Sequence, residues 1–102
     1  MKRAAIYARI ENKKDNGEEL KRQIRELEAY CEEKGYQVII VIAEYRKDKI
    51  VSMNLLTLLT DSPNIDVIVM RDKNQICVNE AEVQRFETLT NEHGIDIEFL
   101  AE

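Results

Sequence analysis

The residues best suited to chemistry are a few charged side chains that directly follow short apolar runs. Arg9 ends the run RAAIYAR and could bind a phosphate or another anion, and Glu11 could act as a catalytic acid. Glu44 and Asp72 follow two further apolar runs, so these three carboxylates could together form a phosphoacceptor site. The simpler expectation is that Arg9 forms an ion pair with Glu11 or Glu44.

The other reactive side chains indicate no metal site and no cofactor site. Cys31 and Cys77 are far apart and form neither a CxxC motif nor a pair with histidine, so we expect two reduced thiols, with Cys31 in the core. His93 is interpreted as a residue of a last helical turn. The run Arg46 to Lys49 is predicted to be a solvated loop rather than a DNA contact. A net charge of −5 also argues against a domain that binds nucleic acid by itself.

The hydrophobic pattern predicts the elements that carry these residues. Continuous apolar runs predict strands, and apolar residues at helical spacing predict helices. The run over residues 36–43 is β-branched throughout, which is typical of a strand covered on both faces of a parallel sheet. We expect strands over residues 3–9, 36–43, 65–70 and 95–100, and helices over residues 18–34, 53–59 and from Asn79 to Gly94.

Polar residues before each predicted helix have the spacing of N-terminal caps. Asn16 with Glu19, and Asn79 with Glu82, each resemble a capping box, and Ser52 is placed to cap the short helix. Strands that alternate with helices predict an α/β doubly wound sheet in a single domain, 1–102. Its functional crevice should lie at the carboxyl ends of the strands, where the loops 10–17, 44–51 and 71–78 meet.

The first strand and helix also carry a family resemblance. The motif YAR at residues 7–9 precedes a helix in which Leu20, Gln23, Leu27, Tyr30, Cys31, Gly35, Tyr36 and Val38 match the pattern SLxxQxxxLxxYCxxxGYxV. This combination resembles the catalytic domain of serine site-specific recombinases of the resolvase and invertase family. The similarity covers nearly the whole chain. It implies a resolvase-like, flavodoxin-like fold with a mostly parallel four-stranded sheet flanked by helices.

The resemblance also implies where catalytic residues would stand. The family attacks a DNA phosphodiester with a serine two residues after the arginine of YAR, and that position is Glu11 in this chain. A carboxylate there repels the phosphate instead of attacking it by the family route. Arg9 is the remaining member of the arginine set that stabilises the transition state in the family.

The rest of the family site aligns with residues of different chemistry. A run resembling LDRLSR aligns with residues 73–78, so Asn74 replaces the aspartate, and Gln75 and Val78 replace both arginines. Ser52 aligns approximately with a further arginine, and Glu44 stands where the family has an aspartate. We therefore expect no recombinase activity.

The predicted function is that of an inactive interaction or regulatory module in the cytoplasm. It would associate with itself or pair with an active recombinase, without a membrane. Any DNA contact would be weak or depend on regions that the family carries beyond residue 102. The alternatives are an active recombinase domain and a flavodoxin-like phosphoacceptor or small-molecule-binding module.

Overall fold

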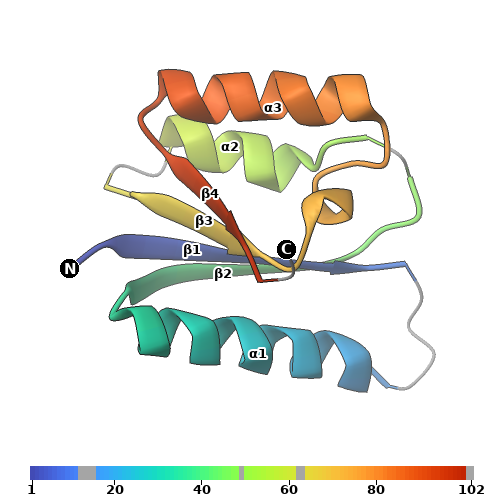
Figure 1. Ribbon diagram of the computed structural model, residues 1–102. Coiled ribbons are helices and arrows are strands. Elements are labelled where there is room, and N and C mark those ends of the chain that lie inside the picture. The colour runs from blue at the N-terminus through green and yellow to red at the C-terminus, as the bar shows by residue number, and fades with distance from the viewer. Residues whose placement is uncertain (12–15, 49, 62–63, 101–102) are drawn as a thin grey trace.

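The chain folds around one four-stranded parallel sheet. The computed structural model describes residues 1–11, 16–48, 50–61 and 64–100. The strand order is β2-β1-β3-β4, and every neighbouring pair is parallel (Figure 1). The predicted fold class is therefore confirmed. The elements are β1 (Arg3–Ile10), α1 (Glu18–Lys34), β2 (Gln37–Tyr45), α2 (Met53–Asp61), β3 (Val67–Met70), the short 3-10 helix η1 (Lys73–Gln75), α3 (Glu80–Glu92) and β4 (Asp96–Phe99).

Helices cover both faces of the sheet. Helix α1 packs on one face, and α2 and α3 pack on the other (Figure 1). The central strand β1 divides its side chains between the two layers, because successive residues of a strand point to opposite faces. Ala4, Ile6 and Ala8 join the core beneath α1, whereas Ala5 and Tyr7 join the core beneath α2 and α3. In the described ranges no helix has the length and apolar character needed to cross a bilayer.

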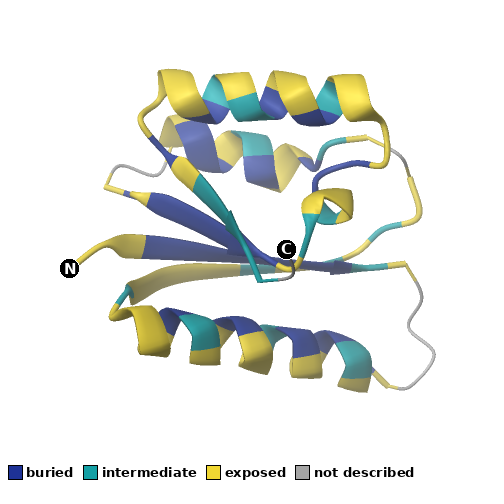
Figure 2. Cartoon of the chain, in the orientation of Figure 1, coloured by how far each residue is buried: buried dark blue, intermediate teal, exposed yellow. Residues whose placement is uncertain are grey.

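Strand β2 departs from the expectation that both of its faces are covered. It is an edge strand, and Val38, Ile39, Ile40 and Val41 are 36–45% exposed. Most of β2 is accordingly coloured as exposed in Figure 2. A continuous apolar run has the same appearance in a covered strand and in an exposed edge, so the pattern alone did not distinguish them. The pairing with β1 shifts register between Ala4 and Ala5, which leaves Ile39 without a partner residue in the ladder.

The predicted capping box at the start of α1 is wrong. The N-cap residue is Gly17, with a φ of 83°, and no side chain forms a capping hydrogen bond at this end of the helix. Asn16 also has a positive φ, of 56°, whereas a capping side chain is normally presented from extended backbone. Glu19 instead forms ion pairs with Arg22 and Arg71.

The caps of α2 and α3 agree with the sequence pattern. The Asn79 side chain accepts hydrogen bonds from the amides of Ala81 and Glu82, and Ser52 Oγ accepts one from the amide of Leu55 at 3.4 Å. The Glu82 carboxylate does not complete the expected box in the contacts described, because it pairs with Arg85. His93 is the C-cap residue of α3, one position beyond the last turn in which it was expected.

Candidate functional site

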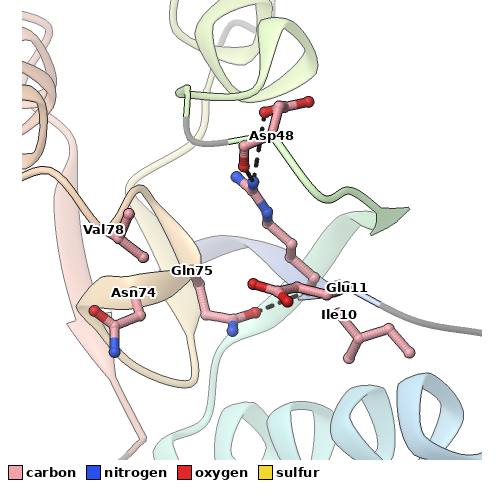
Figure 3. A pocket seen from close by; sticks show the side chains of 7 residues that line it. Ile10, Glu11, Asp48, Asn74, Gln75 and Val78 are labelled. Carbon is pink, nitrogen blue, oxygen red and sulfur yellow. Dashed lines mark hydrogen bonds and ion pairs between the residues drawn. The ribbon is translucent and has the colours of Figure 1, made fainter.

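A hollow lies at the carboxyl ends of the strands, between the end of β1, the loop after β2 and η1. Its volume is about 240 Å³. We call it the Arg9 pocket (Figure 3). Five of the seven predicted site residues meet there, namely Arg9, Glu11, Asn74, Gln75 and Val78. Ile10 and Asp48 complete the lining.

The Arg9 guanidinium is bound by the loop that follows β2. Its Nη1 donates to the carbonyl of Ile50 at 3.2 Å, and its Nη2 donates to the carbonyl of Asp48 and lies 3.5 Å from Asp48 Oδ1. The side chain is only 9% exposed. The expectation of an ion pair with Glu11 or Glu44 is therefore corrected: the partner of Arg9 is Asp48, whose loop folds across the strand end (Figure 3).

Two glutamine side chains hold the backbone of Arg9. Its amide donates to Gln75 Oε1 at 2.8 Å and to Gln23 Oε1 at 3.2 Å. This arrangement has a structural cause, since β1 pairs with β3 only as far as Ile6. A buried amide beyond that point needs an acceptor, and the glutamines supply it from η1 and α1. Gln75 therefore uses its side-chain oxygen to hold the end of β1.

Within the described lining, the Arg9 pocket contains one cationic side chain and two carboxylates. Arg9 is opposed by Glu11 and Asp48. A hydrogen bond from Arg46 lowers the pKa of Asp48 further, so its carboxylate is ionised at neutral pH. Nevertheless, the described residues contain no group of three His, Cys, Asp or Glu side chains that could hold a metal ion.

Glu44 and Ser52 lie outside this pocket, in a second group that we call the Glu44 cluster, formed by Tyr7, Glu44, Ser52 and Asn54. The Tyr7 hydroxyl donates to Glu44 Oε1 at 2.6 Å, and Asn54 Nδ2 donates to Glu44 Oε2 at 2.7 Å. Burial opposes ionisation of Glu44, but hydrogen bonds from Ser52, Tyr7 and Asn54 outweigh it and lower its pKa. Burial and the Glu44 carboxylate raise the pKa of Tyr7. The cluster thus connects β1, β2 and α2.

Asp72 also has a structural role. Its side chain caps η1 by accepting from the amide of Asn74 at 2.9 Å. The three carboxylates Glu11, Glu44 and Asp72 therefore do not share one set of contacts. A phosphoacceptor site made from them has no support in this geometry.

Sequence reasoning missed Asp48 and Gln23. The run 46–49 was predicted to be a solvated loop, and Lys47 and Asp48 are indeed exposed, whereas Lys49 lies outside the described residues. In addition, Asp48 pairs with Arg46 at 2.7 Å and reaches Arg9. No local signal identifies this long-range contact. Gln23 did carry a signal, because it lies three residues after Leu20 and four before Leu27 and so shares their buried face.

Comparison with known proteins identifies the family. The family model described as "Resolvase, N terminal domain" matches residues 4–102. The chain belongs to this family. The match includes the YAR motif and helix α1, on which the resemblance of the sequence to serine recombinases was based.

Solved structures share the architecture of this resolvase domain. The C-terminal catalytic domain of ISC1926 TnpA, an IS607-like serine recombinase, is 28% identical with a TM-score of 0.80, covering 98% of this chain and 70% of its own. The N-terminal catalytic domain of TP901-1 integrase is 18% identical with a TM-score of 0.81, covering 97% and 77%. A resolvase family site-specific recombinase from Streptococcus pneumoniae is 12% identical with a TM-score of 0.79, covering 95% and 70%. The last two similarities concern the fold alone. No curated protein matches the chain.

Proposed function

We propose that this resolvase-family domain is catalytically silent and acts by binding another resolvase-type domain, either a second copy or an active recombinase. The main support for the proposal is that the Arg9 guanidinium already has binding partners within the chain. It is bound by Asp48 and by two loop carbonyls, in a pocket that also contains Glu11. A phosphodiester would have to displace these groups and then lie against two carboxylates.

Glu11 removes the chemistry of strand exchange. A serine hydroxyl can form a phosphoester with DNA and pass it to a new strand, whereas a carboxylate would give an acyl phosphate that water hydrolyses. Glu11 is exposed and lies beside the pocket, so its charge also faces an approaching phosphate. Both effects oppose recombination.

The missing arginines remove transition-state stabilisation. Gln75 uses its carbonyl oxygen to hold the Arg9 amide, and Val78 is 61% exposed with an apolar side chain. Losing one donor from such a site typically lowers the rate by a factor of roughly a hundred to a thousand. The loss of two arginines together with the nucleophile leaves no measurable recombinase activity.

Titration with inorganic phosphate, followed by NMR at the Arg9 amide, tests whether the Arg9 pocket binds a phosphate group. We expect no saturation at millimolar phosphate in the natural chain. Val78→Arg should create a measurable phosphate site, because the exposed position accepts a long side chain at the pocket rim. Gln84→Arg, on the exposed face of α3, adds the same charge elsewhere and should not. Saturable binding at Arg9 in the natural chain would contradict the proposal.

Two further measurements test the remaining parts. Neither the natural chain nor Glu11→Ser should form a covalent adduct with supercoiled plasmid DNA on a denaturing gel. An adduct with Glu11→Ser alone would show that the arginines are dispensable. Light scattering across a wide concentration range tests the interaction role, and a strict monomer that also fails to bind an active recombinase in a pull-down would contradict it.

A further inference from the structure

Helix α2 presents an outer face with almost no charge. Asp61 is the only charged residue of α2, whereas α1 and α3 carry charged residues from the first turn to the last. A helix that covers a sheet normally presents charged residues to water on its outer side. The outer side of α2 consists mainly of the exposed residues Met53, Asn54, Thr57 and Thr60 (Figure 2). Such a surface, with methionine and little charge, is typical of the centre of a protein interface.

A groove lies beside this face, between α2 and the edge strand β2. Its volume is about 320 Å³, and the side chains that line it are all uncharged, namely Ile40, Val41, Ile42, Asn54, Thr57 and Leu58. Ile40 and Val41 are 37% and 40% exposed, so part of this apolar lining faces solvent. The Asn54 side chain donates to Glu44 at 2.7 Å, which fixes one wall of the groove before anything binds.

The most exposed apolar side chain of α2 lies next to this groove. Met53 is 65% exposed and directly precedes Asn54, which lines the groove. Methionine is flexible and polarisable, so it fills irregular apolar hollows well. Met53 is not part of the lining in its own chain. One face of the molecule therefore carries both a projecting apolar side chain and an apolar hollow, which are the two halves of a self-complementary contact.

We propose that a second copy of this chain docks on α2, with Met53 of each copy in the groove of the other. This assignment rests on the interaction role proposed above and names its surface and its partner. A two-fold axis makes the two contacts equivalent, with the α2 helices antiparallel. Met53 then packs against Thr57 of the other copy, and the small threonine side chain lets the helices approach closely.

Charge favours a second copy as the occupant of this surface. The chain carries a net charge of −5, so two copies repel each other unless they meet where acidic groups are few. The groove and the outer face of α2 as far as Thr60 meet this requirement. Antiparallel helices also bring the exposed Asp61 of one copy toward the exposed Lys47 of the other, in the segment before α2. Opposite charges therefore meet at both ends of the interface, whereas an unrelated apolar helix would leave them unmatched.

Sedimentation velocity over a wide range of concentrations measures this association, and the natural chain should show a reversible equilibrium between monomer and dimer. Thr57→Asp should raise the dimer dissociation constant at least about tenfold, because it buries two additional carboxylates at the centre of the interface. Thr88→Asp, at an exposed threonine of α3, adds the same charge elsewhere and should leave the constant unchanged. Circular dichroism checks that both variants fold. Equal effects of the two variants would overturn the proposal.

A second pair of variants tests the projecting side chain. Met53→Ala should raise the dissociation constant about tenfold, because each copy loses the residue that fills the other's groove. Val78→Ala also shortens an exposed apolar side chain, 61% exposed, but one that lies at the Arg9 pocket. It should leave the constant unchanged. Weaker association of Val78→Ala with no effect of Met53→Ala would move the interface to the Arg9 pocket and overturn the proposal.

Charge exchange at low ionic strength tests the antiparallel arrangement. Lys47→Asp and Asp61→Lys should each associate about threefold more weakly than the natural chain, because like charges then meet at both ends of the dimer. An equimolar mixture of the two variants should recover the natural dissociation constant, because the mixed dimer again pairs opposite charges. A mixture that associates no better than the separate variants would overturn the two-fold arrangement.

Failure of this dimer and failure of the proposed function give different results. A natural chain that stays monomeric but binds an active recombinase in a pull-down would overturn the α2 dimer and leave the interaction role intact. A strict monomer that binds neither would overturn both. Phosphate binding at Arg9 would contradict the catalytically silent pocket and leave the α2 dimer standing.

Discussion

The Arg9 pocket and the Glu44 cluster lie side by side yet use their polar groups differently. Tyr7 and Arg9 are two residues apart on the same face of β1, and each is buried. Tyr7 donates to a carboxylate whose two oxygens both receive hydrogen bonds from well-placed neighbours. Arg9 donates to an exposed loop, and an open hollow remains beside it.

The different surroundings of the two groups predict different roles, one in the stability of the fold and one in binding. In the Glu44 cluster, removing Glu44 leaves the hydroxyl of the buried Tyr7 without its acceptor, which is costly. In the Arg9 pocket, the groups that lose their partner when Arg9 is replaced can bind water instead, because Asp48 and Ile50 are exposed. We therefore expect the cluster to determine the free energy of unfolding and the pocket to determine what the domain binds.

The largest effect should come from Glu44→Ala. It removes the acceptor of both Tyr7 and Asn54, and the Tyr7 hydroxyl is left at a fully buried residue. We expect the free energy of unfolding to fall by about 2 to 3 kcal/mol. Urea denaturation measures this as a lower midpoint with an unchanged slope.

Glu11→Ala is the matched control for the pocket. Glu11 is exposed, and no contact with it is described, so its removal should hardly change the midpoint. Equal destabilisation by the two variants would remove the distinction between cluster and pocket.

The next largest effect should come from Arg9→Met. Methionine keeps much of the packing of the buried stem but loses the hydrogen bonds to Ile50 and Asp48. Because those loop groups can turn to water, we expect a loss of about 1 to 2 kcal/mol. Arg85→Met, at an exposed helical position, should lie within about 0.5 kcal/mol of the natural chain. A larger loss at Arg9 than at Glu44 would reverse the comparison.

A smaller effect should appear as a dependence on pH. The folded pKa of Glu44 lies below its ordinary value of 4.5, so its ionised form stabilises the fold above that value. This contribution is lost as the pH falls through the lowered pKa. The midpoint difference between the natural chain and Glu44→Gln should therefore be constant near pH 7 and shrink below about pH 4.5. A difference that persists unchanged at the acidic end would mean that ionisation of Glu44 contributes little.

Much of the fold could be predicted from the sequence because its signals are local. The periodicity of α1, the cap at Asn79 and the apolar runs of β1 and β3 each depend on neighbouring residues alone. The exposure of β2 could not be predicted, since it depends on strand order. The cap of α1 failed because Asn16 and Gly17 take left-handed conformations that a spacing rule does not detect.

Part of the candidate site could also be predicted from the sequence. Loops that follow parallel strands converge at one edge, so Arg9 and Gln75 could be expected to meet. The role of Gln75 as an acceptor for a backbone amide could not, because it depends on where β1 and β3 stop pairing. The contact of Arg9 with Asp48 spans 39 residues and has no local signature.

The smallest effect on stability should come from Asp48→Asn, and it gives the sharpest test of the pocket. The Asp48 side chain is 43% exposed, so water can solvate it in place of its ion pairs, and the carbonyl groups of Asp48 and Ile50 would still hold the guanidinium. We therefore expect no resolvable shift in the urea midpoint. Phosphate affinity should rise, because one of the two carboxylates that repel an anion is removed. If the midpoint falls while phosphate still fails to bind, the Arg9–Asp48 pair stabilises the loop, and it is Glu11 that keeps anions out of the pocket.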